Sequence, residues 1–128
     1  MKTPNATISK AELDVLKALW KSGAGTVREV GARLNRRRRR WAYTTVQTLL
    51  CRLEVKGYVS CERSGVPHVF RAAVSRDKLV RLRLRDLADN LCEGTAIPLV
   101  MALVREERFS EMEIEQFRRL LETMEPRK

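Results

Sequence analysis

A helix-start pattern occurs three times along the chain and determines where three of its helices begin. A hydroxyl residue stands three positions before a glutamate in Ser9–Glu12, Thr26–Glu29 and Ser110–Glu113. In such a capping box, the two side chains bind backbone N–H groups that the first turn of a helix leaves without partners. We therefore expect a helix at each of these positions, and the small residues at 22–25 end the first one.

Another helix is predicted over residues 42–56, and Gly57 is a suitable residue to follow its last turn. After Gly57 the pattern changes to that of two strands, 58–63 and 68–72, with turn-forming residues at 64–67 between them. Three helices followed by a hairpin is the element order of a winged helix-turn-helix. The apolar residues of the third helix recur at the spacing of one helix face, and they are Val46, Leu49, Leu50 and Leu53.

The rest of the chain is predicted to be helical. One helix begins after Ser75 and is interrupted at Gly94, a short apolar helix follows over 95–104 with Pro98 in its first turn, and the last helix starts at Ser110. Apolar residues in these helices recur at spacings close to those of a coiled-coil seam, which favours packing against the helices of a second copy, with a bundle closed within one chain as the alternative. The candidate dimerisation residues are Val80, Leu84, Leu87, Leu91, Val100, Leu103, Ile114, Phe117, Leu121 and Met124.

These patterns predict a winged-helix DNA-binding domain at 1–74 and a helical dimerisation region at 75–128. The fold class is mainly α with a small β-hairpin. The whole net charge of +10 lies in the first region, which has 15 Lys and Arg against 5 Asp and Glu. The second region has 11 of each and is neutral. A local excess of positive charge attracts a polyanion, although it also suits a solvated surface kept for solubility.

The outward face of the third helix carries residue types that can read DNA bases. Threonine hydroxyls bond base edges, a threonine methyl packs on a thymine methyl, and an arginine can bind guanine through two hydrogen bonds. The alternative is an ordinary amphipathic helix whose outer face is only solvated. The candidate base-reading residues are Thr44, Thr45, Thr48 and Arg52, with Gln47 at the flank.

Five consecutive arginines, Arg36, Arg37, Arg38, Arg39 and Arg40, precede that helix. In a helix-turn-helix this connection passes near the DNA backbone, so we assign these arginines to phosphate contact. A mobile, solvated loop is the alternative. Further candidates for phosphate or wing contact are Tyr43, Arg63 and Arg71.

The sequence offers little for catalysis or metal binding. Cys51, Cys61 and Cys92 show no C-x-x-C or C-x-C spacing, and His68 is the only histidine. We therefore expect no enzyme activity, no metal site and no cofactor. The longest apolar run, Ile97–Val104, is too short to cross a bilayer, and no apolar signal segment is visible, so we expect a cytoplasmic protein without membrane insertion.

Three stretches of the chain resemble the penicillinase repressor family (BlaI/MecI/CopY type). Residues 9–20 resemble its opening helix, and residues 43–57 resemble its recognition helix with the following glycine. Leu91–Thr95, followed by Leu99–Val100 and the helix at Ser110, matches in order and spacing. The resemblance extends over about residues 8–124.

The resemblance implies a repressor with a winged helix and a helical dimerisation arm, which binds palindromic double-stranded operators as a homodimer. In the β-lactam branch it also implies a membrane-sensor protease that cleaves the arm. The Asn-Phe pair cut in that branch aligns with Ala102–Leu103 here. The copper-responsive branch carries C-x-C motifs that residues 124–128 do not contain, so we do not expect copper sensing by that route.

Two other functions fit the same residues. A non-specific or architectural nucleic-acid-binding protein also uses polyarginine and threonine-rich surfaces for backbone contact. A protein-interaction module could dock its basic part on an acidic partner. Retention of an operator in excess unrelated DNA distinguishes a specific repressor from a non-specific binder, and loss of all DNA affinity at moderate salt favours the protein-interaction module.

Overall fold

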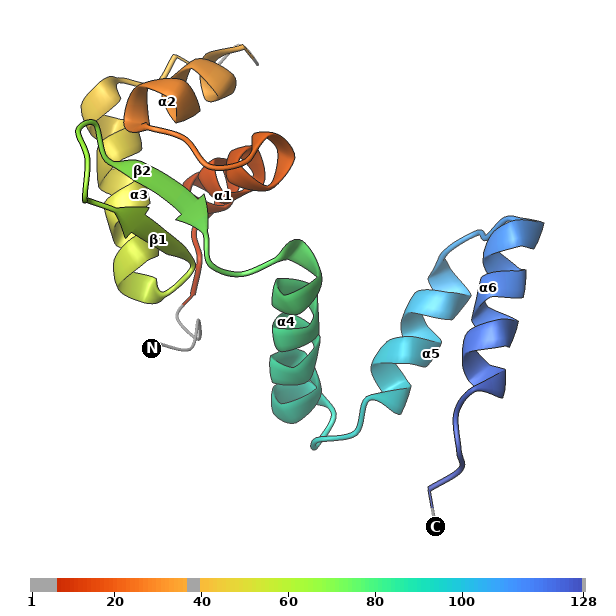
Figure 1. Ribbon diagram of the computed structural model, residues 1–128. Coiled ribbons are helices and arrows are strands. Elements are labelled where there is room, and N and C mark those ends of the chain that lie inside the picture. Colours follow the sequence, from red (N-terminus) through yellow and green to blue (C-terminus); the bar gives the residue numbers. More distant parts are fainter. Residues whose placement is uncertain (1–6, 37–39, 128) are drawn as a thin grey trace. The chain divides into compact units, whose positions relative to one another are not determined.

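The computed structural model describes residues 7–36 and 40–127 of the chain (Figure 1). The described residues form six helices and one two-stranded antiparallel sheet. The chain divides into two compact units, one ending at Arg83 and the other beginning at Leu84. The elements in chain order are α1 (Lys10–Ser22), α2 (Val27–Asn35), α3 (Tyr43–Lys56), β1 (Val59–Glu62), β2 (Val69–Ala72), α4 (Arg76–Leu91), α5 (Ile97–Glu106) and α6 (Glu111–Glu122).

All three predicted capping boxes are present. At α1, the Glu12 N–H donates to Ser9 Oγ at 3.1 Å and the Ser9 N–H donates to Glu12 Oε1 at 2.9 Å. The starts of α2 and α6 show the same reciprocal pair of hydrogen bonds. Gly23 ends α1 with φ at 83°, a backbone conformation that a residue with a Cβ rarely adopts.

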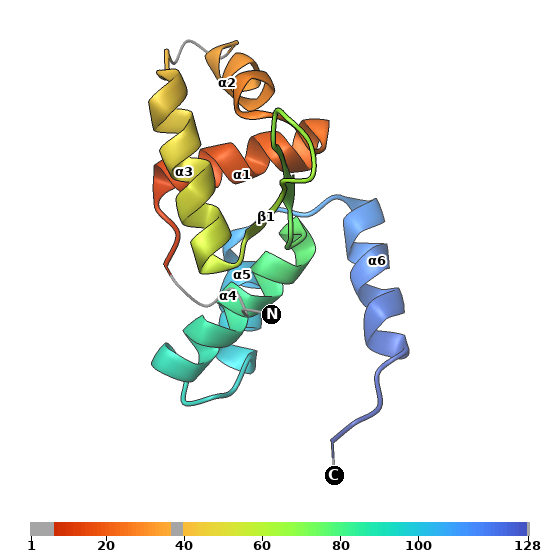
Figure 2. The ribbon, with the colours of Figure 1, turned by 60° about the vertical axis from the view of Figure 1, so that its left-hand side comes forward.

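The core of the N-terminal unit lies between α1, α2, α3 and the sheet (Figure 2). The predicted apolar stripe of α3 is confirmed, because Val46, Leu49, Leu50 and Leu53 are all buried. They pack with buried side chains of the first two helices, which are Val15, Leu16, Leu19, Val27, Val30 and Leu34. This packing fixes which face of α3 turns outward.

The hairpin is the predicted wing, with Val59 opposite Ala72 and Glu62 opposite Val69. The strands are shorter than the predicted 58–63 and 68–72. Tyr58 lies outside β1 because its N–H donates to Leu53 O at 2.9 Å and so completes the end of α3. A bridge from Gly25 to Phe70 adds the turn before α2 to the edge of the sheet, with N–O distances of 2.8 and 2.9 Å.

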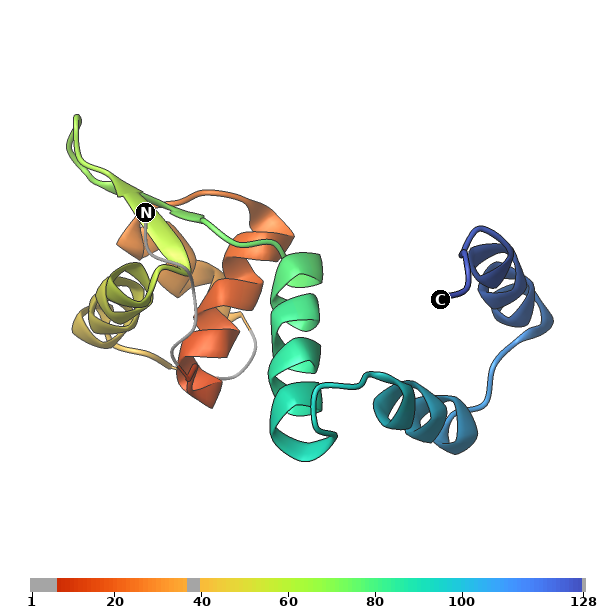
Figure 3. The same cartoon turned by 90° about the horizontal axis from the view of Figure 1, so that it is seen from below.

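The first turns of α4 belong to the N-terminal unit (Figure 3). Leu79 is part of the core, and the Trp20 indole N–H donates to Val74 O at 2.8 Å just before α4 begins. The Arg83 guanidinium donates to the Tyr58 hydroxyl at 2.5 Å. The compact units therefore separate within α4, and the functional division after residue 74 stays a prediction.

The second unit contains the end of α4 together with α5 and α6. Pro98 stands in the first turn of α5 as expected, and Phe109 packs edge-on against Phe117 with ring centroids 4.8 Å apart. The helix predicted over residues 95–104 begins at Ile97 and ends at Glu106, so both of its ends lie two residues later than predicted. No residue of α5 or α6 is buried in the described chain. No helix among the described residues has the length and apolar character needed to cross a membrane.

Candidate nucleic-acid interface

Helix α3 presents a polar outward face opposite its buried stripe. All five predicted base-reading residues are exposed there, together with Tyr43 and Cys51. Thr44 and Thr45 lie in the first turn, whereas Gln47, Thr48 and Arg52 lie on the following two turns. The structure thus places the predicted residues on one surface, and their contact with bases stays a prediction.

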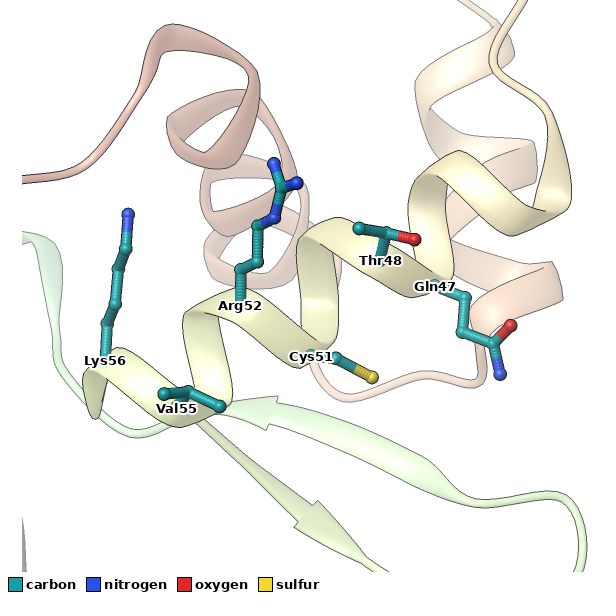
Figure 4. Close-up of a pocket in the computed structure, with 6 residues that line it drawn as sticks. All are labelled: Gln47, Thr48, Cys51, Arg52, Val55 and Lys56. Carbon is teal, nitrogen blue, oxygen red and sulfur yellow. The ribbon is translucent and has the colours of Figure 1, made fainter.

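A shallow depression on this face is lined by side chains of the later turns of α3 (Figure 4). Thr48 and Arg52 project from neighbouring turns, and Gln47 and Cys51 project beside them. Val55 extends the surface and is 64% exposed, although the sequence analysis did not single it out. An exposed valine here can pack on a thymine methyl, as a threonine methyl does. The lining residues are Gln47, Thr48, Cys51, Arg52, Val55 and Lys56.

The arginine run is described only at its two ends. Arg36 follows α2 as its C-cap residue, Arg40 lies just before α3, and both are exposed. Arg37, Arg38 and Arg39 lie outside the described residues. Asn35 Oδ1 accepts a hydrogen bond from the Trp41 N–H at 2.8 Å, and Trp41 packs partly on the core. This contact links the end of α2 to the residue that precedes α3 by two positions.

The two predicted wing arginines have different surroundings. Arg71 is exposed on β2, opposite Ser60. Arg63 follows β1, and its two terminal nitrogens each donate to a carboxylate oxygen of Glu54 on α3 at 2.6 Å. This ion pair lowers the pKa of Glu54, mainly through the hydrogen bonds from Arg63, and raises the pKa of Arg63. Arg63 therefore joins the wing to α3.

A second ion pair, which the sequence did not indicate, supports the C-terminal end of α3. Lys56 Nζ donates to Glu12 Oε1 at 2.8 Å and also to Thr7 O at 2.8 Å. Glu12 is 3% exposed. Its burial raises the pKa, but the hydrogen bonds from Lys56 and Ser9 outweigh that effect, so the pKa lies below the ordinary value. One glutamate thus caps α1 and anchors α3.

The chemistry of this surface is that of binding. Hydroxyl, amide and guanidinium groups can bond base edges and phosphates, whereas the described residues contain no cluster of three or more metal-ligating groups. Cys61 lies on β1, where burial raises its thiol pKa and so makes it a poorer nucleophile at neutral pH.

The comparisons with known proteins agree with this geometry. The model of a family described as "Penicillinase repressor" matches residues 8–123. The penicillinase repressor of Bacillus licheniformis is 27% identical over 121 residues, which are 94% of each chain. The methicillin resistance regulatory protein MecI of Staphylococcus aureus (strain N315) is 23% identical over 89% of this chain and 92% of its own.

A solved structure extends the likeness to the fold. The solution structure of the DNA-binding domain of the repressor BlaI is 32% identical, and the match covers 61% of this chain and 93% of that domain, with a TM-score of 0.52. The predicted fold class, mainly α with a winged helix and a small hairpin, is confirmed. The family consists of repressors and not of enzymes. The chain belongs to the penicillinase repressor family of DNA-binding, winged-helix transcriptional repressors.

Proposed function

We propose that the protein is a sequence-specific repressor whose helix α3 reads base edges in the major groove of its operator. The main support is the division of α3 into a fully buried aliphatic stripe and an exposed face of threonine, glutamine and arginine. An α-helix fits the major groove, where these side chains can distinguish base pairs. The base-reading residues in this proposal are Thr44, Thr45, Gln47, Thr48 and Arg52.

Phosphate contacts complete the proposed interface. In the sequence, Arg36–Arg40 come before α3, Tyr43 is its first residue, and Arg71 follows it on the wing, so these residues flank the reading surface along the chain. Contacts of this kind set the register of the protein on DNA without reading sequence. Arg63 contributes by holding the wing to α3, because both its terminal nitrogens bind Glu54.

A homodimer is the second element of the proposal. The predicted dimerisation residues are all exposed in the single chain, and α5 and α6 bury no residue at all. Apolar surface of this extent is rare on monomers and marks an interface. The region 75–128 has no net charge, so two copies associate without strong repulsion. A second copy of the chain is therefore the partner we propose.

A two-fold dimer carries two α3 helices related by the same symmetry. Such a pair matches a palindromic operator whose half-sites lie about one helical turn of DNA apart. By their names, the penicillinase repressor of Bacillus licheniformis and MecI of Staphylococcus aureus are regulators. We propose the same kind of role here.

Release from DNA by proteolysis in the arm, by a membrane-sensor protease, is part of this proposal. Ala102 and Leu103, the pair aligned with the cleavage site of the β-lactam branch, lie inside α5 and are exposed. A protease needs an extended substrate, so cleavage here requires local opening of α5. Leu103 is also a proposed dimerisation residue, so cleavage also requires this part of α5 to leave the dimer interface.

Footprinting on the DNA upstream of the protein's own gene tests sequence-specific binding. A specific repressor protects one palindromic segment and keeps it in the presence of excess unrelated DNA. Equal affinity for every duplex indicates the architectural function instead. Loss of all DNA affinity at moderate salt indicates an acidic protein partner.

Sedimentation equilibrium at micromolar concentration tests the dimer. We expect twice the single-chain mass of 14.8 kDa. The variant Leu87→Asp/Leu121→Asp should sediment as a monomer with a folded N-terminal unit and bind operator weakly. Asn90→Asp/Gln116→Asp adds the same charge to the same helices outside the apolar set and should stay dimeric. A wild-type protein of single-chain mass contradicts the proposal.

A further inference from the structure

A cleft on the N-terminal unit lies outside the proposed base-reading surface of α3. It lies along α1 and is bounded by the end of α2 and the start of α4, with a volume of about 930 Å³. This volume is in the range of clefts that hold small organic molecules. All its described lining residues belong to the N-terminal unit.

The lining of the cleft is strongly cationic. Five basic side chains line it, whereas Asp14 is the one acidic residue among its described lining residues. Three elements contribute these bases, so no single helix face accounts for them. The five are Lys17 and Lys21 of α1, Arg33 and Arg36 at the end of α2, and Arg76 at the start of α4.

Apolar surface lies among these charges. Ala18, Trp20 and Leu34 also line the cleft, and Leu34 is buried. The Arg76 guanidinium stands 5.4 Å from the centre of the Trp20 ring. Arg33 donates to Gly23 O and Ala24 O at 2.7 and 3.2 Å, which fixes the position of its guanidinium beside the turn after α1. A guanidinium has five N–H donors, so Arg33 can still donate to a ligand.

We propose that this cleft binds a small organic anion, a carboxylate or sulfonate with an apolar body, and that binding lowers the affinity for DNA. The basic rim supplies charge-assisted hydrogen bonds to the acid group. Trp20, Ala18 and Leu34 supply contact area for the apolar part.

The effect on DNA follows from Arg36 and rests on the proposed function. Arg36 belongs to the arginine run proposed to contact phosphate, and it also lines the cleft. An anion bound there pairs with a charge that DNA otherwise neutralises. Because coupling between two sites is reciprocal, bound DNA must lower the affinity of the cleft for the anion by the same factor.

The first test uses 2-naphthoate as the probe and nuclear magnetic resonance of the full chain. The Trp20 indole N–H, which donates to Val74 O, reports from the wall of the cleft, and the Trp41 indole outside it is the internal reference. We expect a saturable shift of the Trp20 signal with 2-naphthoate and none with neutral 2-naphthylmethanol. Equal shifts for both compounds, or none for either, overturn the proposal.

Variants of the cleft locate the binding. Lys21→Gln/Arg76→Gln removes two rim charges and should lower the affinity for 2-naphthoate about tenfold or more. Lys78→Gln removes a charge from the same turn of α4 outside the cleft and should bind like wild type. Unchanged affinity in the double variant overturns the assignment.

The second test measures operator binding by fluorescence anisotropy with and without saturating 2-naphthoate. We expect the Kd for operator to rise in wild type and to stay constant in Lys21→Gln/Arg76→Gln. An unchanged wild-type Kd overturns the coupling to DNA. The resonance experiment contains no DNA, so a protein that binds 2-naphthoate but fails to prefer any operator contradicts only the proposed function.

Discussion

Arg63 of the wing and Glu54 of α3 are joined by two parallel hydrogen bonds of 2.6 Å each. A paired fork of this kind is the strongest geometry for an arginine and a carboxylate. It fixes the hairpin relative to the helix that carries the candidate base-reading residues. It also occupies an arginine that the sequence assigned to DNA contact, and it places a negative charge near a surface proposed to meet phosphate.

The variant Glu54→Gln tests this dual role. We expect affinity for random DNA to rise and the preference for operator to fall, because Arg63 becomes available to phosphate and the wing loses its anchor. One added phosphate contact steepens the log–log salt dependence by about 0.9. Glu122→Gln removes a carboxylate from α6, outside the proposed DNA interface, and it is the matched control. The same slope in both variants contradicts the prediction.

Base reading by α3 is tested with Arg52→Ala and Thr48→Ala, measured separately. Each should weaken operator binding by about 1–3 kcal/mol and relax discrimination at particular base pairs. The measurement is a panel of operators with single base-pair changes. Arg118→Ala on α6 is the control and should leave the panel unchanged. A loss of equal size on operator and random DNA shows that these side chains do not read sequence.

The arginine run is tested by replacing Arg36–Arg40 with glutamine. Binding to all duplexes should weaken, and the log–log salt slope should flatten by about 0.9 for each phosphate that the variant no longer neutralises. The control replaces Arg105, Arg118 and Arg119 of the arm with glutamine. These arginines lie far from the run in sequence, so their loss should change the salt slope little. A run that is only solvated gives the wild-type slope.

The pair of Glu12 and Lys56 predicts a pH dependence of stability. The pKa of Glu12 is lowered in the folded protein, so its contribution is present above the ordinary value of 4.5 and is lost as pH falls through the folded pKa. Lys56→Met should reduce the free energy of unfolding by about 1–3 kcal/mol at pH 7. Urea titrations should show this difference shrinking well below pH 4.5. A difference independent of pH contradicts the role of the charge.

Local structure was largely readable from the sequence. The capping boxes at Ser9, Thr26 and Ser110 depend only on residues three positions apart, so the sequence alone determines where those helices begin. The buried stripe of α3 follows from its spacing in the same way. Because that stripe must face the core, the exposure of Thr44, Thr48 and Arg52 follows as well.

The tertiary structure decided the contacts between residues far apart in the chain. Glu12 meets Lys56 across 44 positions, and Trp20 meets Val74 across 54. Periodicity assigns a residue to a face of its own helix, but it does not say which side chain of another element lies opposite. For the same reason the cationic cleft was invisible in the sequence, since its five bases come from three helices that only packing brings together.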